Sequence, residues 1–147
     1  MSERLRLPEL ALPALAGGAG TALRARRQGT VLALLRAPVA ARDAAWVRDF
    51  AAREAELREW DGRALVVLEC ASGDADAIAS LGAVAPAVPV LADAHGALAR
   101  AAGVAAPALV ITDQYGEVYA SREATEGWMP LDEIVAWLKY LSIRCAG

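Results

Sequence analysis

The sequence predicts an α/β protein with a mixed central sheet, a parallel core of strands and helices on both faces of the sheet. Three short, continuous apolar runs, at 30–35, 64–68 and 108–112, have the length and content of strands that are covered on both sides. The segments between these runs carry helical periodicity or helix-capping residues. Because strand-forming and helix-forming segments alternate along the 147 residues, we expect a single domain, 1–147, with a full hydrophobic core.

The N-terminal segment predicts a β-hairpin that precedes the main sheet. Residues 5–13 alternate loosely between apolar and polar types, and Pro8 and Pro13 restrict them to an edge strand or an extended arm. The glycines within 17–20 form a turn, and 21–23 can return from it as a short strand. The main sheet then begins with the first of the three apolar runs.

The rest of the chain predicts an alternation of helices and strands. Asp43 is expected to cap a helix that runs to about residue 60, where Asp61 and Gly62 end it. The second apolar run follows as a buried strand. The later elements that we expect are a short helix capped by Ser72 or Asp74 and ended by Gly82, a strand at 88–91, a helix at 96–102, a hairpin at 108–120, a polar loop at 121–127 and a last helix that begins at Pro130.

Composition and charge argue against several classes of function. The net charge is −3 and the arginines are interleaved with acids, so nothing indicates a nucleic-acid partner. One histidine and two cysteines do not supply a zinc site or a disulfide framework, and we expect no metal and no other cofactor. Residues 1–10 lack the apolar core of a signal peptide, and no apolar run approaches the ~20 residues of a membrane span. We therefore expect a soluble, cytoplasmic protein with no membrane span.

Two stretches in the second half of the chain carry a family resemblance. Residues 90–104 (VLADAHGALARAAGV) and 106–118 (APALVITDQYGEV) are similar, in order and spacing, to motifs of the redoxin branch of the thioredoxin superfamily. That branch includes peroxiredoxin-like, alkyl hydroperoxide reductase and thiol-specific antioxidant proteins. The N-terminal arm and residues 134–145 also resemble this family, so the resemblance extends over essentially the whole chain.

The resemblance implies a thioredoxin-like three-layer α/β/α sandwich with a mixed central sheet and an N-terminal β-hairpin. It further implies that Pro107 is the cis-proline of the family, which faces the active-site turn. That turn joins a strand to a helix, and in the family it carries the reactive cysteine.

The corresponding turn of this chain has no nucleophilic side chain. A Cys-Pro-x-Cys motif would align with it in either of two registers that differ by one residue, and neither register contains cysteine, serine or threonine. The thiolate is the nucleophile in this chemistry, and alanine cannot supply one. Arg36 or Arg42 is similar in position to a family arginine, which has no thiolate to activate here. The residues of the degenerate turn are Ala37, Pro38, Val39, Ala40 and Ala41.

Cys70 and Cys145 are the remaining thiols, and each has two interpretations. Cys70 could lie near the N-terminus of the helix that follows the first apolar run, where the helix dipole lowers a thiol pKa. A cysteine at the end of an apolar strand is more often a small buried hydrophobe. Cys145 could form a mixed disulfide or a dimer bridge, or it is an incidental tail residue. We favour the structural interpretation for both and expect no catalytic residue.

Four residues are candidates for a partner-binding surface. Arg36 and Arg42 flank the degenerate turn, and Trp128 and Met129 precede the last helix. The sequence therefore predicts a redox-inactive, thioredoxin-like domain that binds a protein partner or forms a homo-oligomer, as an accessory subunit of a complex. The alternative is a thiol oxidoreductase or peroxidase-like antioxidant enzyme that uses one of the two cysteines.

Overall fold

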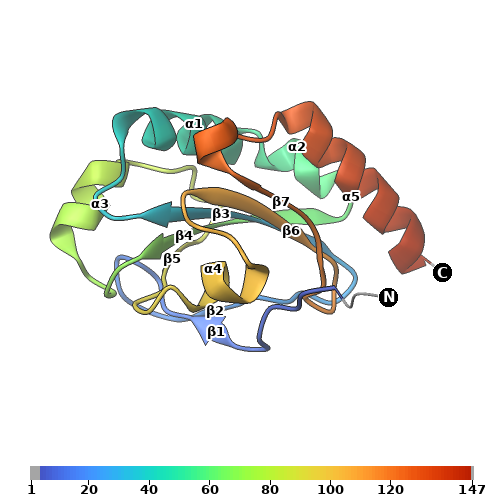
Figure 1. Cartoon of the computed structure of the whole chain (residues 1–147), viewed down its shortest axis with the longest axis horizontal. Coiled ribbons are helices and arrows are strands. Elements are labelled where there is room, and N and C mark those ends of the chain that lie inside the picture. Colours follow the sequence, from blue (N-terminus) through green and yellow to red (C-terminus); the bar gives the residue numbers. More distant parts are fainter. Residues whose placement is uncertain (1–3, 147) are drawn as a thin grey trace.

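The structure is built around a five-stranded mixed sheet in the order β5-β4-β3-β6-β7 (Figure 1). It is a computed structural model that describes residues 4–146, with side chains described for 4–144. In this sheet β3, β4 and β5 are parallel to one another, β6 is antiparallel to β3, and β7 is antiparallel to β6. Their bounds are β3 (Gly29–Arg36), β4 (Gly62–Glu69), β5 (Val90–Ala92), β6 (Ala108–Thr112) and β7 (Val118–Glu123).

The predicted N-terminal hairpin is confirmed. Its strands β1 (Ala11–Leu12) and β2 (Thr21–Ala22) pair antiparallel in a small separate sheet. The arm between them also covers the outer edge of β5, because the Leu15 amide donates to the Val90 carbonyl at 2.8 Å and the Ala92 amide donates to the Pro13 carbonyl at 2.9 Å. These bonds satisfy backbone groups that an open edge strand would leave exposed.

Helices cover both faces of the sheet, as predicted. One face is covered by α1, α2, α3 and α5, and the other by α4 together with the N-terminal arm (Figure 1). Within residues 4–146, no helix combines the length and the apolar content that a membrane span requires. The helix bounds are α1 (Ala41–Ala52), α2 (Glu54–Arg58), α3 (Ala75–Leu81), α4 (Ala97–Ala102) and α5 (Leu131–Ala146), with a short 3₁₀ helix η1 (Ala124–Glu126) before α5.

The central strand β3 contributes to the core on both faces of the sheet. Val31, Ala33 and Leu35 point to the face that carries α1 and α5, and Leu32 and Leu34 point to the opposite face. Their side chains are at most 3% exposed. This alternation is the expected consequence of the two-residue period of a strand, and it explains why 30–35 contains no polar position after Thr30.

Local boundaries differ from the prediction in the first half of the chain. The predicted single helix at 43–60 is two helices, separated at Arg53, where φ is −104°. The expectation that Asp43 is the N-cap is wrong: Ala40 holds that position without a side-chain hydrogen bond, and Asp43 lies inside the first turn. The predicted cap of the next helix is confirmed, because the Asp74 carboxylate accepts from the Ala77 amide at 3.0 Å.

The predicted polar loop at 121–127 is only partly a loop. β7 continues to Glu123, and η1 occupies 124–126. Pairing with β6 explains the longer strand, because Arg122 and Glu123 lie opposite Leu109 and Ala108 in the register.

Gly62 allows the last helix to approach the start of β4. A Cβ at this position would lie 2.6 Å from Leu138 Cδ1 and 3.0 Å from the Leu57 carbonyl oxygen. Leu138 is fully buried and cannot withdraw into solvent. The side chain of residue 62 therefore has to be absent for α5 to close on the sheet.

Replacing Gly62→Ala should lower the free energy of unfolding by about 1–3 kcal/mol, the usual cost of overpacking a core. Urea denaturation measures the effect as a shift of the midpoint at unchanged slope. Gly29→Ala is the milder control, because its Cβ would lie 3.1 Å from Leu138 Cδ2. In a Leu138→Ala background the Gly62→Ala cost should shrink, because the clashing methyl groups are gone. An equal cost in both backgrounds would contradict this account.

Candidate functional site

The degenerate turn lies where three segments meet at one end of the sheet. The turn leaves the carboxyl end of β3, whose last residue, Arg36, pairs with Glu69 at the end of β4. On the other side, β6 begins directly after Pro107. The Ala106–Pro107 peptide bond is cis, as the resemblance implied, and the Ala37–Pro38 bond is cis as well. The sheet thus presents the turn, the end of β4 and the proline loop together.

Val39 fills the centre of the turn and anchors it. Its side chain is 7% exposed and belongs to the core. Its amide donates to Ser80 Oγ at 2.9 Å, and that hydroxyl donates in turn to the Ala77 carbonyl at 2.9 Å. The turn is therefore tied to α3 through backbone and hydroxyl groups, and it does not use a reactive side chain to hold its shape.

A buried acid occupies the first turn of α1. Asp43 is 9% exposed, and its carboxylate accepts a hydrogen bond from Trp128 Nε1 at 3.0 Å. The Trp128 ring also stacks on Trp46, with centroids 4.2 Å apart and planes 8° from parallel, and Trp46 stacks on Phe50 at 5.2 Å. This cluster joins α1 to the segment before α5. The sequence alone did not reveal the contact, because its partners are 85 positions apart.

The proline loop is held by the end of β7. The Ala105 amide donates to Glu123 Oε2 at 2.7 Å, and the Ala124 amide donates to the Pro107 carbonyl at 2.8 Å. Glu123 thus positions the loop that faces the turn, a role that sequence reasoning missed. The only signal available for it was an acidic residue at the end of a strand.

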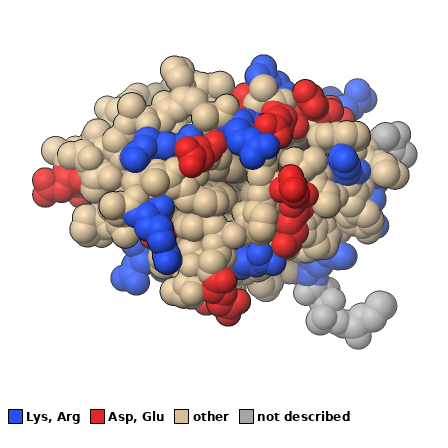
Figure 2. All heavy atoms as spheres, turned by 90° about the horizontal axis from the view of Figure 1, so that it is seen from above, with Lys and Arg blue, Asp and Glu red and all other residues tan. Residues whose placement is uncertain are grey.

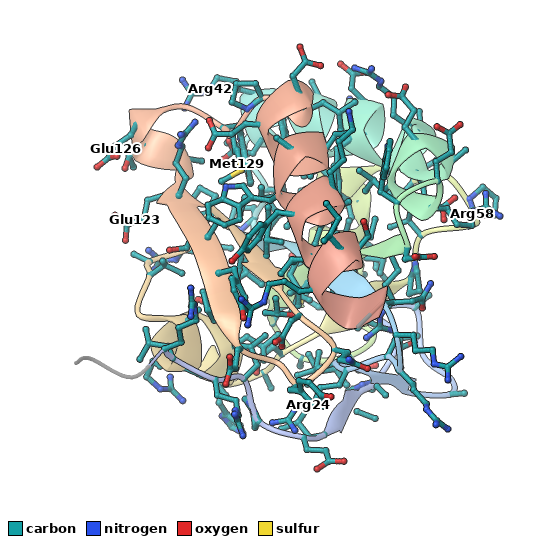
Figure 3. The ribbon with its side chains drawn as sticks, turned by 90° about the vertical axis from the view of Figure 1, so that its right-hand side faces the viewer. Arg24, Arg42, Arg58, Glu123, Glu126 and Met129 are labelled. Carbon is teal, nitrogen blue, oxygen red and sulfur yellow. The ribbon has the colours of Figure 1, made fainter. Side chains whose placement is uncertain are left out.

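The four partner-surface candidates separate into exposed and buried residues. The Arg36 side chain is 70% exposed, with its Nε 4.0 Å from Glu69 Oε2, and Arg42 is exposed. Trp128 is half-buried in the aromatic cluster. Met129 is 2% exposed and lies behind the start of α5, so its proposed place on a partner surface is wrong (Figure 3). Met129 is buried in the same core cluster as Ile134 and Leu138 of α5.

The charge around this site is mixed. Figure 2 shows acidic and basic side chains interspersed on the face that α1, α2 and α5 form. Among the described residues, no group of three or more His, Cys, Asp or Glu side chains is placed to hold a metal ion.

Cys70 is close to the turn in the sheet, and its surroundings raise its pKa. It follows Glu69 directly, is half-buried and packs against the core. Burial raises the pKa of the Cys70 thiol above its ordinary value, and the negative charge of Asp74 raises it further. A reactive thiol needs the opposite shift. Cys145 lies in α5, and its side chain is outside the described residues.

Replacing Trp128→Phe should remove the hydrogen bond to Asp43 and keep most of the stack. We expect a loss of about 1–2 kcal/mol in the free energy of unfolding, because a carboxylate then stays buried without this donor. Urea denaturation provides the measurement, and exposed Trp60→Phe is the control. The effects of Trp128→Phe and Asp43→Ala should be less than additive. Full additivity would show that the two residues stabilise the fold independently.

Comparison with known proteins identifies the fold. No protein-family model and no curated protein sequence matches the chain. Among solved structures, the exposed lipoprotein thioredoxin Etrx1 of Streptococcus pneumoniae strain TIGR4 matches 91% of this chain and 100% of its own, with a TM-score of 0.72 and 21% identity. Enterococcus faecalis AhpC matches 94% of this chain and 90% of its own, with a TM-score of 0.71 and 21% identity. Reduced 2-Cys peroxiredoxin of Plasmodium vivax matches 90% of this chain and 78% of its own, with a TM-score of 0.72 and 13% identity. The chain has the thioredoxin-like fold that these redoxins share.

Proposed function

We propose that this chain is a redox-inactive thioredoxin-like domain that serves as a partner-binding or accessory subunit of a protein complex. The observation that carries the proposal is the turn between β3 and α1. Residues 37–41 offer neither a thiol nor a hydroxyl, so nothing in them can attack a disulfide or a peroxide. The backbone that would present such a group is nevertheless in place and anchored by Val39 and Ser80.

The surroundings of the turn suit contact with another chain better than chemistry. Pro38, Ala40 and Ala41 are exposed and small, so a partner backbone can approach closely. Arg36 and Arg42 flank this patch with long cationic side chains. Such a surface combines close access in the centre with charged side chains at the rim, which is the general arrangement of a protein interface.

The proposal is tested with variants that change the two thiols and the surface of the turn independently. A Cys70→Ser, Cys145→Ser double variant should co-purify with the same partners as the unmodified chain, in equal amounts. Arg42→Glu should reduce recovery of those partners, because it reverses charge beside the turn, whereas Arg26→Glu makes the same charge change at another exposed position and should not. Loss of peroxide or disulfide turnover in Cys70→Ser would instead support the alternative, a thiol oxidoreductase or peroxidase-like enzyme.

The Cys70 thiol should react slowly with an alkylating reagent. In a Cys145→Ser background, its rate with iodoacetamide at pH 7 should be below that of N-acetylcysteine, and the half-maximal rate should occur at a higher pH. Both follow from the raised pKa of Cys70. Asp74→Asn keeps an N-cap acceptor but removes the charge, so it should lower the pKa of Cys70 and speed the reaction. A Cys70 that reacts faster than N-acetylcysteine would overturn this view of the site.

A further inference from the structure

Three cations on or beside α5 lie over aromatic rings. The Arg4 guanidinium carbon is 4.0 Å from the Tyr119 ring centroid, and Lys139 Nζ is 4.8 Å from the Trp60 ring centroid. The Arg144 guanidinium carbon is 5.7 Å from the Tyr119 ring centroid and 5.8 Å from the Tyr140 ring centroid. Arg4 comes from the N-terminal arm, and Lys139 and Arg144 come from α5. The surface around Tyr119 and Tyr140 therefore combines the positive charge of Arg4 and Arg144 with aromatic rings.

A pocket of about 370 Å³ opens within this surface. The Trp137 and Tyr140 rings meet edge to face there, with centroids 6.1 Å apart and planes at 83°. We call this the α5 pocket, and it has room for one large side chain. Its lining residues are Arg4, Glu133, Ala136, Trp137 and Tyr140.

The charge of the α5 pocket is positive, although one acid lines it. Arg122 Nη2 donates to both oxygens of Glu133, at 2.9 and 3.0 Å, so this carboxylate is already neutralised. Among residues 4–144, no carboxylate lies within ion-pair distance of Arg4, Lys139 or Arg144.

The acids on the neighbouring β6–β7 hairpin are also occupied. Glu117 pairs with Arg6 at 2.8 Å, and Asp113 accepts the amides of Tyr115 and Glu117 at 2.9 and 3.0 Å. Arg4, which lines the pocket, and Arg144, which lies over the same Tyr119 ring, thus have no carboxylate partner among residues 4–144.

Arg4 is arranged to accept an anion from outside the chain. The Arg4 guanidinium carbon lies 4.0 Å from the Tyr119 ring centroid, and the N–H donors of a guanidinium lie in the plane of the group. A carboxylate can therefore bind the edge of Arg4 without displacing it from the ring, and a planar guanidinium suits a carboxylate in a two-point contact.

We propose that the α5 pocket docks an acidic segment of a partner protein. An apolar side chain of that segment fills the space between Trp137 and Tyr140, and an adjacent carboxylate binds Arg4. The pocket lies on α5 and shares no residue with the turn, so this proposal is independent of the proposed function. The charge favours a short acidic peptide over a long polyanion, because the chain as a whole carries −3.

The test titrates the isotope-labelled full-length chain with an acetylated, amidated pentapeptide, Asp-Phe-Asp-Leu-Asp, followed by NMR. We expect saturable shifts in the amides of 133–140 and in the Trp137 indole, with affinity falling as salt rises. The counterpart peptide with asparagine for aspartate should not bind. Arg4→Gln should weaken binding about threefold to tenfold. Ala136→Glu, at an exposed lining position, should abolish binding at an unchanged melting temperature.

Arg26→Gln is the matched control, because it removes the same charge from an exposed arginine that does not line the pocket. An equal weakening by Arg26→Gln would overturn the proposal in favour of non-specific attraction. Equal binding of the asparagine peptide, or shifts that do not include α5, would also overturn it. Vesicles of phosphatidylserine and phosphatidylcholine form the second arm. Arg4-dependent binding to them without peptide binding would replace the acidic segment with an anionic bilayer.

Discussion

The burial of β3 on both faces is the constraint on which the rest of the structure depends. This strand pairs with β4 on one side and β6 on the other, and its apolar side chains enter two separate cores. Full burial of one such leucine or valine stabilises the fold by roughly 1.5–3 kcal/mol. The place where β3 ends, and with it the position of the turn and of α1, is therefore determined by the core. Within the turn Val39 contributes to the core, whereas Ala40 and Ala41 are exposed, and small residues are therefore tolerated at these two positions.

The dependence of the fold on buried strands also explains how much of it the sequence could predict. The apolar runs at 30–35, 64–68 and 108–112 were identified because a strand buried on both sides has a simple local pattern. Asp74 was one of two candidates for the N-cap, with Ser72, because such a cap involves a residue only three positions away. The site depended on contacts without such patterns. An acid at position 43 is equally consistent with an N-cap and with a residue in the first turn of a helix. Its hydrogen bond to Trp128 cannot be predicted from the local sequence around either residue, because the two are 85 positions apart.

The turn lacks a thiol, and its surroundings would do little to activate one. A helix N-terminus activates a thiol through its positive dipole, and a carboxylate in the first turn offsets that dipole. Here Asp43 holds this position and is buried. Arg36, which could supply positive charge, lies 4.0 Å from the Glu69 carboxylate. The nearby Cys70 thiol has its pKa raised by both burial and Asp74. The absence of a nucleophile and the electrostatics of its surroundings thus point in the same direction, and a cysteine introduced into this turn would meet an environment that does little to ionise it.

Under the proposed function the domain acts through its surfaces, and the two candidate surfaces differ in character. The turn is small, uncharged at its centre and rigidly anchored, so it is suited to close contact with a partner backbone. The α5 pocket is aromatic and cationic, so it is suited to a side chain with a neighbouring carboxylate. If two segments of one partner occupy both surfaces, the second contact forms at the high effective concentration that the first provides. Two individually weak contacts would then hold a complex together without covalent chemistry, which is the physical requirement for an accessory subunit of this fold.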